Sequence, residues 1–114
     1  MNSGDTIVAP ATPLGFSGLA VVRVSGPSAF KFAEIATHKK SLKNRFATLV
    51  TFYNKKGEKV DRVVITRFVA PASYSGEDMV EISSHGNPTI VDAIVSTFCS
   101  HGARIADPGE FTYR

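Results

Sequence analysis

This sequence has little cysteine, no tryptophan and no long apolar run, and the first and last of these shortages each exclude a class of protein. The 114 residues include one cysteine, Cys99, and no tryptophan. Because one cysteine cannot form an internal disulfide, we exclude a disulfide-stapled secreted fold and interpret Cys99 as a reduced residue of an apolar helix. No apolar run approaches the roughly 18 residues that a membrane span needs. We therefore expect a soluble protein that has no membrane partner.

Signals for export, metal binding and nucleotide binding are also missing. The amino-terminal stretch lacks the basic and apolar segments of a secretory signal, and Asp5 argues against a targeting helix, so we expect a cytoplasmic protein. The three histidines stand far apart without cysteine or carboxylate at ligand spacing, which predicts no metal site. The loop at 12–18 lacks the Gly-Lys-Ser/Thr ending of a phosphate loop. No nucleophile and base stand at catalytic spacing, so no catalytic residue is predicted.

What is present is an ordinary globular composition with an uneven distribution of charge. With 43% hydrophobic and 20% charged residues, the chain is long enough for one core, and residues 1–114 are predicted to form one domain. Residues 39–67 hold nine Lys and Arg against Glu58 and Asp61, a local charge of +7 within a net charge of +3. Such a segment suits phosphate binding, and it equally suits a solvated hairpin whose lysines keep foreign strands from pairing.

The hydrophobic patterns predict an α+β fold. Their order, β-β-α-β-β-β-α-β, implies a mixed, mainly antiparallel sheet with two helices. Pro88 is expected to open the second helix and Gly102 to end it. The final PGEFTYR shows no further element, and we interpret the end of the sequence as a truncation. Strands are expected at 6–9, 19–25, 46–53, 60–69, 79–84 and 103–106, and helices at 27–38 and from 88 to the Gly102 cap.

Two charged residues interrupt strand faces that otherwise suit burial. Strict alternation places Arg23 on one face with Leu19 and Val21, and Glu81 on one face with Met79. Because a buried charge needs a partner, the two residues could satisfy each other as a structural pair. Alternatively they could bind a ligand, since a carboxylate accepts two hydrogen bonds from a pterin or guanine edge and Arg offers a fork for carboxylates.

Loops beside these strands could complete such a site. His85 and Gly86 precede a helix start, whose backbone N–H groups favour anions, although an ordinary strand-to-helix turn has the same sequence. Gly15 belongs to a Gly-containing loop that leads into the Arg23 strand. We therefore regard Gly15, His85 and Gly86 as possible loop contacts.

Four stretches together resemble, in order and spacing, the start of the tRNA modification GTPases of the MnmE/TrmE type. They are DTIVAPATP (5–13), VVRVSGP (21–27), SYSGEDMVEISSHGNP (73–88) and ARIADPGEFTYR (103–114). The resemblance covers nearly the whole chain and identifies it as the amino-terminal domain. In this family a helical domain and an inserted GTPase follow, so the full-length protein would hydrolyse GTP, while this domain alone would not be catalytic.

The resemblance also implies ligands and partners. The family domain forms a homodimer and binds 5-formyltetrahydrofolate or a related one-carbon folate, and its folate-binding Arg and Glu fall on Arg23 and Glu81. A third contact, a Lys, lies beyond the GEFT motif. With an FAD-dependent partner protein, the whole enzyme adds an aminomethyl-type group to carbon 5 of the wobble uridine of tRNA. Its GTP, Mg²⁺ and K⁺ would bind outside this chain.

This sequence departs from the family pattern in two loops, and two other functions stay open. Phe16 and Ser17 replace an Arg-Gly pair, and Asn87 replaces a glycine, which puts loop contacts in doubt. One alternative is a dimerisation platform without a ligand. The other is an RNA-binding module that uses the basic hairpin, for which we expect little sequence-specific recognition. Its stacking surfaces would be aromatic residues that strand patterns also place in a core: Phe46, Phe52, Tyr53 and Phe68.

Overall fold

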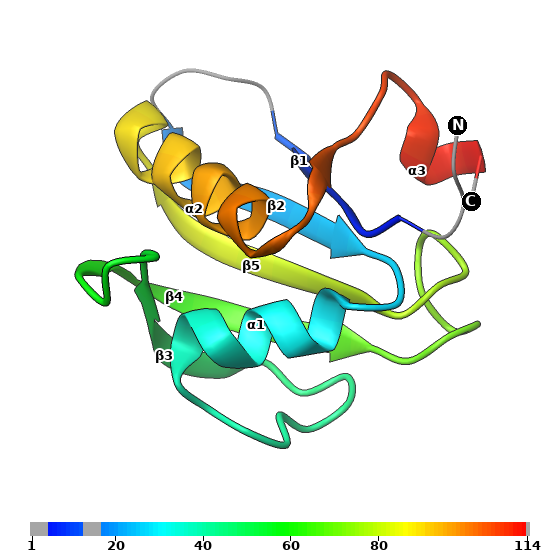
Figure 1. Ribbon diagram of the computed structural model, residues 1–114, viewed down its shortest axis with the longest axis horizontal. Coiled ribbons are helices and arrows are strands. Elements are labelled where there is room, and N and C mark those ends of the chain that lie inside the picture. Colours follow the sequence, from blue (N-terminus) through cyan, green and yellow to red (C-terminus); the bar gives the residue numbers. More distant parts are fainter. Residues whose placement is uncertain (1–4, 13–16, 114) are drawn as a thin grey trace.

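One mixed sheet of six strands, with two helices on one face, forms the body of the protein (Figure 1). The computed structural model describes residues 5–12 and 17–113. The strand order is β3-β4-β5-β2-β1-β6, and every neighbouring pair is antiparallel except β1 with β6. The α+β class with a mixed sheet is confirmed. The elements are β1 (Ile7–Pro10), β2 (Ser17–Ser25), α1 (Ala29–Thr37), β3 (Thr48–Tyr53), β4 (Lys59–Phe68), β5 (Met79–Gly86), α2 (Pro88–His101), β6 (Arg104–Ile105) and α3 (Glu110–Tyr113).

Alternation along the strands decides which side chains enter the core. In β2 the odd-numbered Arg23 lies on the face opposite the helices, while its even-numbered neighbours Val22 and Val24 are fully buried. The same division holds in the other central strands, because side chains in a strand alternate between faces. The core under α1 and α2 is formed largely by Val22, Val24, Val50, Phe52, Val63, Ile65, Val80, Ile82, Ile94 and Phe98.

The second helix begins and ends where its sequence signals predict. Pro88 occupies its first turn, and the Asn87 side chain accepts a hydrogen bond of 2.8 Å from the backbone N–H of Thr89. Gly102, with φ of 123°, ends the helix, and its N–H donates to the carbonyl of Cys99. The predicted boundaries of α2 are confirmed.

The first helix begins two residues later than predicted. Pro27 was expected in its first turn, but α1 starts at Ala29 with Ser28 as the N-cap residue. The backbone N–H of Ser28 donates to Thr6 Oγ1 at 2.9 Å, which keeps this turn tied to the segment before β1. A contact with a residue 22 positions earlier carries no local sequence signal.

The structure corrects the predicted number of helices from two to three. The segment after β6, which was expected to hold no element, forms the one-turn helix α3. Its sequence is too short for a hydrophobic period. The turn forms because the Glu110 carboxylate reaches back to accept a hydrogen bond of 2.9 Å from the backbone N–H of Asp107.

The β2–α1 turn gives a test of the fold. Gly26 has φ of 137°, and a Cβ there would lie 2.6 Å from Thr6 Cα and 2.7 Å from the Asp5 carbonyl oxygen. Because both neighbours are backbone atoms, Gly26→Ala should lower the free energy of unfolding by about 3 kcal/mol or more. Gly57→Ala is the matched control, since Gly57 also has positive φ but an added Cβ meets nothing within 4 Å.

The control should cost only about 1 kcal/mol of backbone strain. Urea unfolding followed by circular dichroism measures both values. Equal losses in the two variants would show that the contact with Thr6 is not what requires glycine at position 26.

Candidate functional site

The two charges that interrupt the strand faces lie directly opposite each other. Arg23 of β2 pairs in register with Glu81 of β5, and Arg23 Nε donates to Glu81 Oε2 at 2.8 Å. Thr66 of β4 is the next residue in this cross-strand row, and Ala9 of β1 lies on the other side of Arg23. The pair therefore stands in the middle of the sheet, on the face that α1 and α2 leave uncovered.

The Arg23–Glu81 ion pair is partly exposed to solvent, and some of its nitrogen and oxygen atoms make no hydrogen bond to the described residues. The side chains of Arg23 and Glu81 are 29% and 28% exposed. Among the described residues, the Nη groups of Arg23 donate no hydrogen bond to the protein, and Glu81 Oε1 accepts none. Two N–H-bearing groups and one carboxylate oxygen are thus available for further partners, in addition to the bond that joins the pair.

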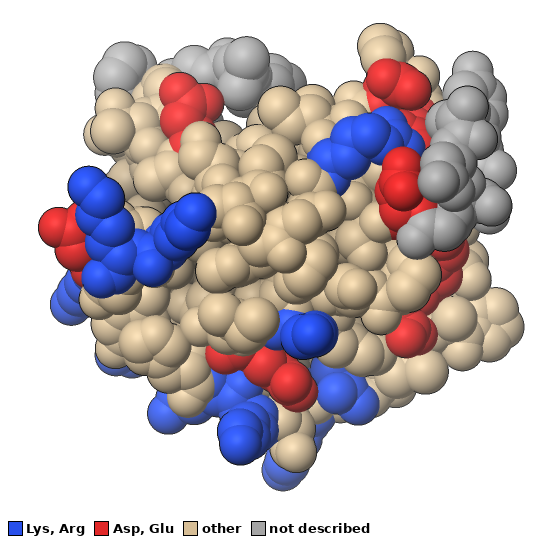
Figure 2. All heavy atoms as spheres, in the orientation of Figure 1, with Lys and Arg blue, Asp and Glu red and all other residues tan. Residues whose placement is uncertain are grey.

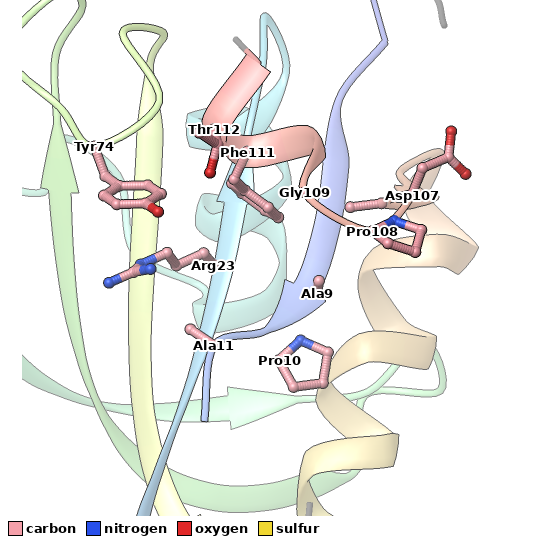
Figure 3. A pocket seen from close by; sticks show the side chains of 11 residues that line it. Ala9, Pro10, Ala11, Arg23, Tyr74, Asp107, Pro108, Gly109, Phe111 and Thr112 are labelled. Atoms are coloured by element: carbon pink, nitrogen blue, oxygen red, sulfur yellow. The ribbon is translucent and has the colours of Figure 1, made fainter. Parts of the chain in front are cut away.

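Tyr74 lies over Arg23 and divides the surface around it into two cavities. The guanidinium carbon of Arg23 is 4.5 Å from the centre of the Tyr74 ring, a cation–π contact. On one side is a cavity of about 360 Å³, bounded by the end of β1 and the segment before and within α3 (Figure 3). On the other is a cavity of about 470 Å³ that contains Glu81 and Arg45. Both volumes are in the range of small-molecule sites.

The loop that carries Tyr74 is fixed by the acidic residues of the Gly-Glu-Asp sequence. Asp78 Oδ1 accepts from the backbone N–H of Ala70 at 2.9 Å, and the Asp78 carbonyl accepts from Gly26. Glu77 accepts a hydrogen bond of 3.0 Å from the hydroxyl of Ser25, which also contacts the buried Ser75. These bonds tie the loop to the end of β2, so the position of Tyr74 depends on the strand that carries Arg23.

A second ion-pair cluster holds the opposite wall of the first cavity. Arg104 donates to both carboxylate oxygens of Glu110, at 3.0 and 2.6 Å, and to Asp5 at 3.0 Å. Glu110 is fully buried. The hydrogen bonds from Glu110 and then Asp5 raise the pKa of Arg104 above its usual value. The cluster fixes the path of residues 107–112, and Figure 3 shows Phe111 and Thr112 of that path facing Tyr74 and Arg23 across the cavity.

The predicted loop contacts lie elsewhere or outside the described residues. Gly15 lies outside them. His85, whose side chain is 69% exposed, hydrogen-bonds through its backbone N–H and its ring to Asp61. Burial raises the pKa of Asp61, but these bonds and the charge of His85 leave that pKa below its usual value. Neither His85 nor Gly86 lines the two cavities beside Arg23, and their role as ligand contacts stays a prediction.

The described residues give little support for a reactive thiol, a metal site or a membrane-spanning helix. Burial raises the pKa of the Cys99 thiol, which disfavours the reactive thiolate. In the described ranges, no three His, Cys, Asp or Glu side chains are grouped closely enough to hold a metal ion. None of the helices that the structure describes has the length and apolar character required to cross a membrane.

Comparison with known proteins supports the family resemblance that the sequence motifs indicate. Residues 6–114 match the family described as GTP-binding protein TrmE N-terminus. This chain belongs to that family. It is 49% identical over its whole length to the tRNA modification GTPase MnmE of Francisella tularensis subsp. holarctica (strain OSU18), and 48% identical to that of Francisella philomiragia. In both cases the chain spans 25% of the relative's length.

In this TrmE N-terminal chain, the tertiary structure adds residues that sequence reasoning missed. Tyr74, Arg45 and Phe111 line the cavities beside Arg23. Tyr74 belongs to the third of the four family-like stretches and Phe111 to the last, and no local pattern in the sequence indicates that the two stretches are in contact. Arg45 was counted only as part of the basic segment, yet its Nη1 donates to the carbonyl of Ala72 at 3.2 Å.

The Arg104 cluster predicts a loss of stability when the buried carboxylate is neutralised. Glu110→Gln keeps the size of the side chain but removes the charge that faces Arg104 and places an N–H₂ donor beside it. We expect the melting temperature to fall by several degrees, because one partner of a buried ion pair is lost. Asp92→Asn, at an exposed position of α2, is the control and should leave the melting temperature nearly unchanged. Equal melting temperatures for both variants in a thermal scan would contradict this role of Glu110.

Proposed function

We propose that this TrmE N-terminal chain is a folate-binding and dimer-forming domain of a tRNA modification GTPase. The observation that carries the proposal is the partly exposed Arg23–Glu81 pair at the junction of two cavities. An ion pair with this exposure stabilises a fold by about 1 kcal/mol or less. A ligand that satisfies both charges can therefore engage them at little cost to the domain.

The chemistry of the pair fits a reduced folate. The 2-amino group and the adjacent ring N–H of a pterin donate two parallel hydrogen bonds, and a carboxylate such as Glu81 is their natural acceptor. The guanidinium of Arg23 offers donors to a folate oxygen or to the carboxylates of the glutamate tail. Arg45 adds a second cation in the cavity that contains Glu81, which favours a ligand with net negative charge. The proposed ligand is 5-formyltetrahydrofolate or a related one-carbon folate.

A row of residues on the uncovered sheet face suits dimer formation. Leu49, Val64, Ser83 and Val21 lie side by side in register across β3, β4, β5 and β2. Leu49 is 60% exposed and Val64 is 37% exposed, and Leu19 of the same face is 67% exposed. A C2 dimer would bury this row against its own copy, as is usual for small homo-oligomers. The same face carries Arg23 and Glu81, so a folate would bind close to the interface.

The activity of the whole protein is proposed from its relatives. Those relatives are named tRNA modification GTPase MnmE, and this chain corresponds to a quarter of their length. Its full-length protein would hydrolyse GTP, with Mg²⁺ and K⁺ bound outside the present residues, in the cytoplasm. With tRNA and an FAD-dependent partner protein, it would modify carbon 5 of the wobble uridine, and the folate would supply the one-carbon unit.

The carboxylate of Glu81 gives a direct test of folate binding. Glu81→Gln keeps the shape of the side chain but presents a donor where the pterin also donates. Binding of 5-formyltetrahydrofolate should weaken by roughly 2 to 4 kcal/mol, measured by calorimetry on the full chain. Glu58→Gln, at the exposed β3–β4 turn, serves as the control and should bind as the unaltered chain does.

The melting temperature without ligand distinguishes a ligand role from a structural role. For a ligand role, Glu81→Gln changes that temperature little, because a partly exposed pair contributes little stability. If the variant instead loses several kcal/mol of stability and keeps its folate affinity, Arg23 and Glu81 form a structural pair and the site assignment is wrong.

Light scattering tests the dimer. The unaltered chain should have the mass of a dimer at tens of micromolar, and Leu49→Asp should shift it to a monomer by placing a charge in the interface. Ile35→Asp is the control, because Ile35 is also an exposed apolar residue, at 46%, but lies on α1 away from the row. A monomer mass for the unaltered chain, or equal dimerisation of both variants, would contradict the proposed interface.

A further inference from the structure

A third cavity lies at the outer edge of the sheet, between the end of α1 and the edge strand β3. Its volume is about 270 Å³. It shares no lining residue with the two cavities beside Arg23. Thr37, His38 and Lys39 form one wall, and the other walls come from β3 and from Arg62 of β4. This cavity is therefore separate from the proposed folate site and has no role assigned so far.

The charge of the cavity is positive. Lys39 and Arg62 are charged lining residues, both are exposed, and none of the described residues that line the cavity is a carboxylate. Lys40, the next residue, and Lys43, a little further along the chain, are also exposed. Figure 2 shows Lys and Arg side chains along the edge of the molecule below α1 and around the β3–β4 hairpin. An anion in the cavity would meet cations on two sides, and a longer polyanion would find more of them along this edge.

Two aromatic rings form part of the same cavity. The imidazole of His38 stacks on the ring of Tyr53, with centroids 3.9 Å apart and planes inclined by 8°. His38 is held there by its left-handed backbone at the end of α1, with φ of 56°. Flat rings beside cations are the usual combination in sites for nucleotide chains, because rings accept stacked bases while cations bind phosphates.

The size and position of the cavity favour one segment of a polymer. A volume of about 270 Å³ is below the usual range for a whole cofactor, and it suits a single phosphate with its sugar. β3 is the edge strand of the sheet. An edge strand leaves part of its backbone N–H groups directed outward, and these also donate to anions.

We propose that the cavity bounded by His38, Lys39, Tyr53 and Arg62 binds a phosphodiester of the tRNA backbone. The inference rests on the proposed function in one respect, which is that tRNA is a partner of the protein. The contact is independent of base sequence, since it uses charge and stacking. The cavity lies at the β3 edge of the sheet and shares no lining residue with the two cavities beside the Arg23–Glu81 pair.

Filter binding of a tRNA transcript to the full chain tests the site. Lys39→Ala/Arg62→Ala should weaken binding about tenfold or more at 150 mM salt. It should also reduce the slope of log Kd against log salt by about 1.8, the value expected for two lost phosphate contacts. The control is Lys55→Ala/Lys56→Ala, which removes the same charge from the β3–β4 turn and should leave affinity at 150 mM salt nearly unchanged. Melting temperatures confirm that all variants are folded.

Tyr53→Leu separates stacking from charge. It should weaken binding several-fold without changing the salt slope, because it removes a ring and no cation. Polyglutamate, added as a competitor, should displace tRNA poorly. Efficient displacement by polyglutamate would overturn the inference in favour of an acidic protein partner.

Equal effects of the two double variants, or no tRNA binding by the unaltered chain, would also overturn this site. Failure of the proposed folate function is seen separately, since the Glu81→Gln titration contains no tRNA and uses none of the residues changed here.

Discussion

The antiparallel register of β2 against β5 brings Arg23 and Glu81 together, and the candidate site is arranged around that contact. The two strands are central in the sheet, so their even-numbered side chains fill the core beneath α1 and α2. Strict alternation then forces Arg23 and Glu81 onto the other face, 58 residues apart in sequence and 2.8 Å apart in space. A slip of one residue in either strand would bury a charge in the core and expose valines.

The walls of the two cavities beside the Arg23–Glu81 pair come from two segments, and each is held in place by its own set of hydrogen bonds. The Tyr74 loop is held by the bond from Ala70 to Asp78 and by the bond from Ser25, at the end of β2, to Glu77. The segment that contains Phe111 is tied by Glu110 to Arg104, which also reaches Asp5. Both anchors are ion pairs or hydrogen bonds to acidic residues, and neither depends on Arg23 or Glu81. A ligand that engaged Arg23 and Glu81 would therefore leave the anchors of both cavity walls intact.

Two exposed surfaces of the sheet have the binding roles that we propose. The face with Arg23 and Glu81 carries the mainly apolar row that we propose to pack against a second copy of the chain. The outer edge at β3 carries cations and the His38–Tyr53 stack. Leu49 lies where the two surfaces meet, since it ends the apolar row and lines the edge cavity. A dimer that buries the row would leave His38 and Lys39 at its rim, because they belong to the end of α1.

Local patterns in the sequence were enough to predict most elements and the unusual strand charges. Alternation in β2 and β5 isolates Arg23 and Glu81, and Pro88 with Gly102 limits α2, because these signals act within a few residues. The start of α1, the helix α3 and the roles of Tyr74 and Arg45 required the tertiary structure. Most of them depend on contacts between segments that only folding brings together, such as Thr6 with Ser28. The helix α3 depends instead on a hydrogen bond between the Glu110 side chain and Asp107, and a single turn is too short to show a hydrophobic period in the sequence. The sequence by itself therefore determined which residues carry charge on the sheet, while the fold decided that they pair and what surrounds them.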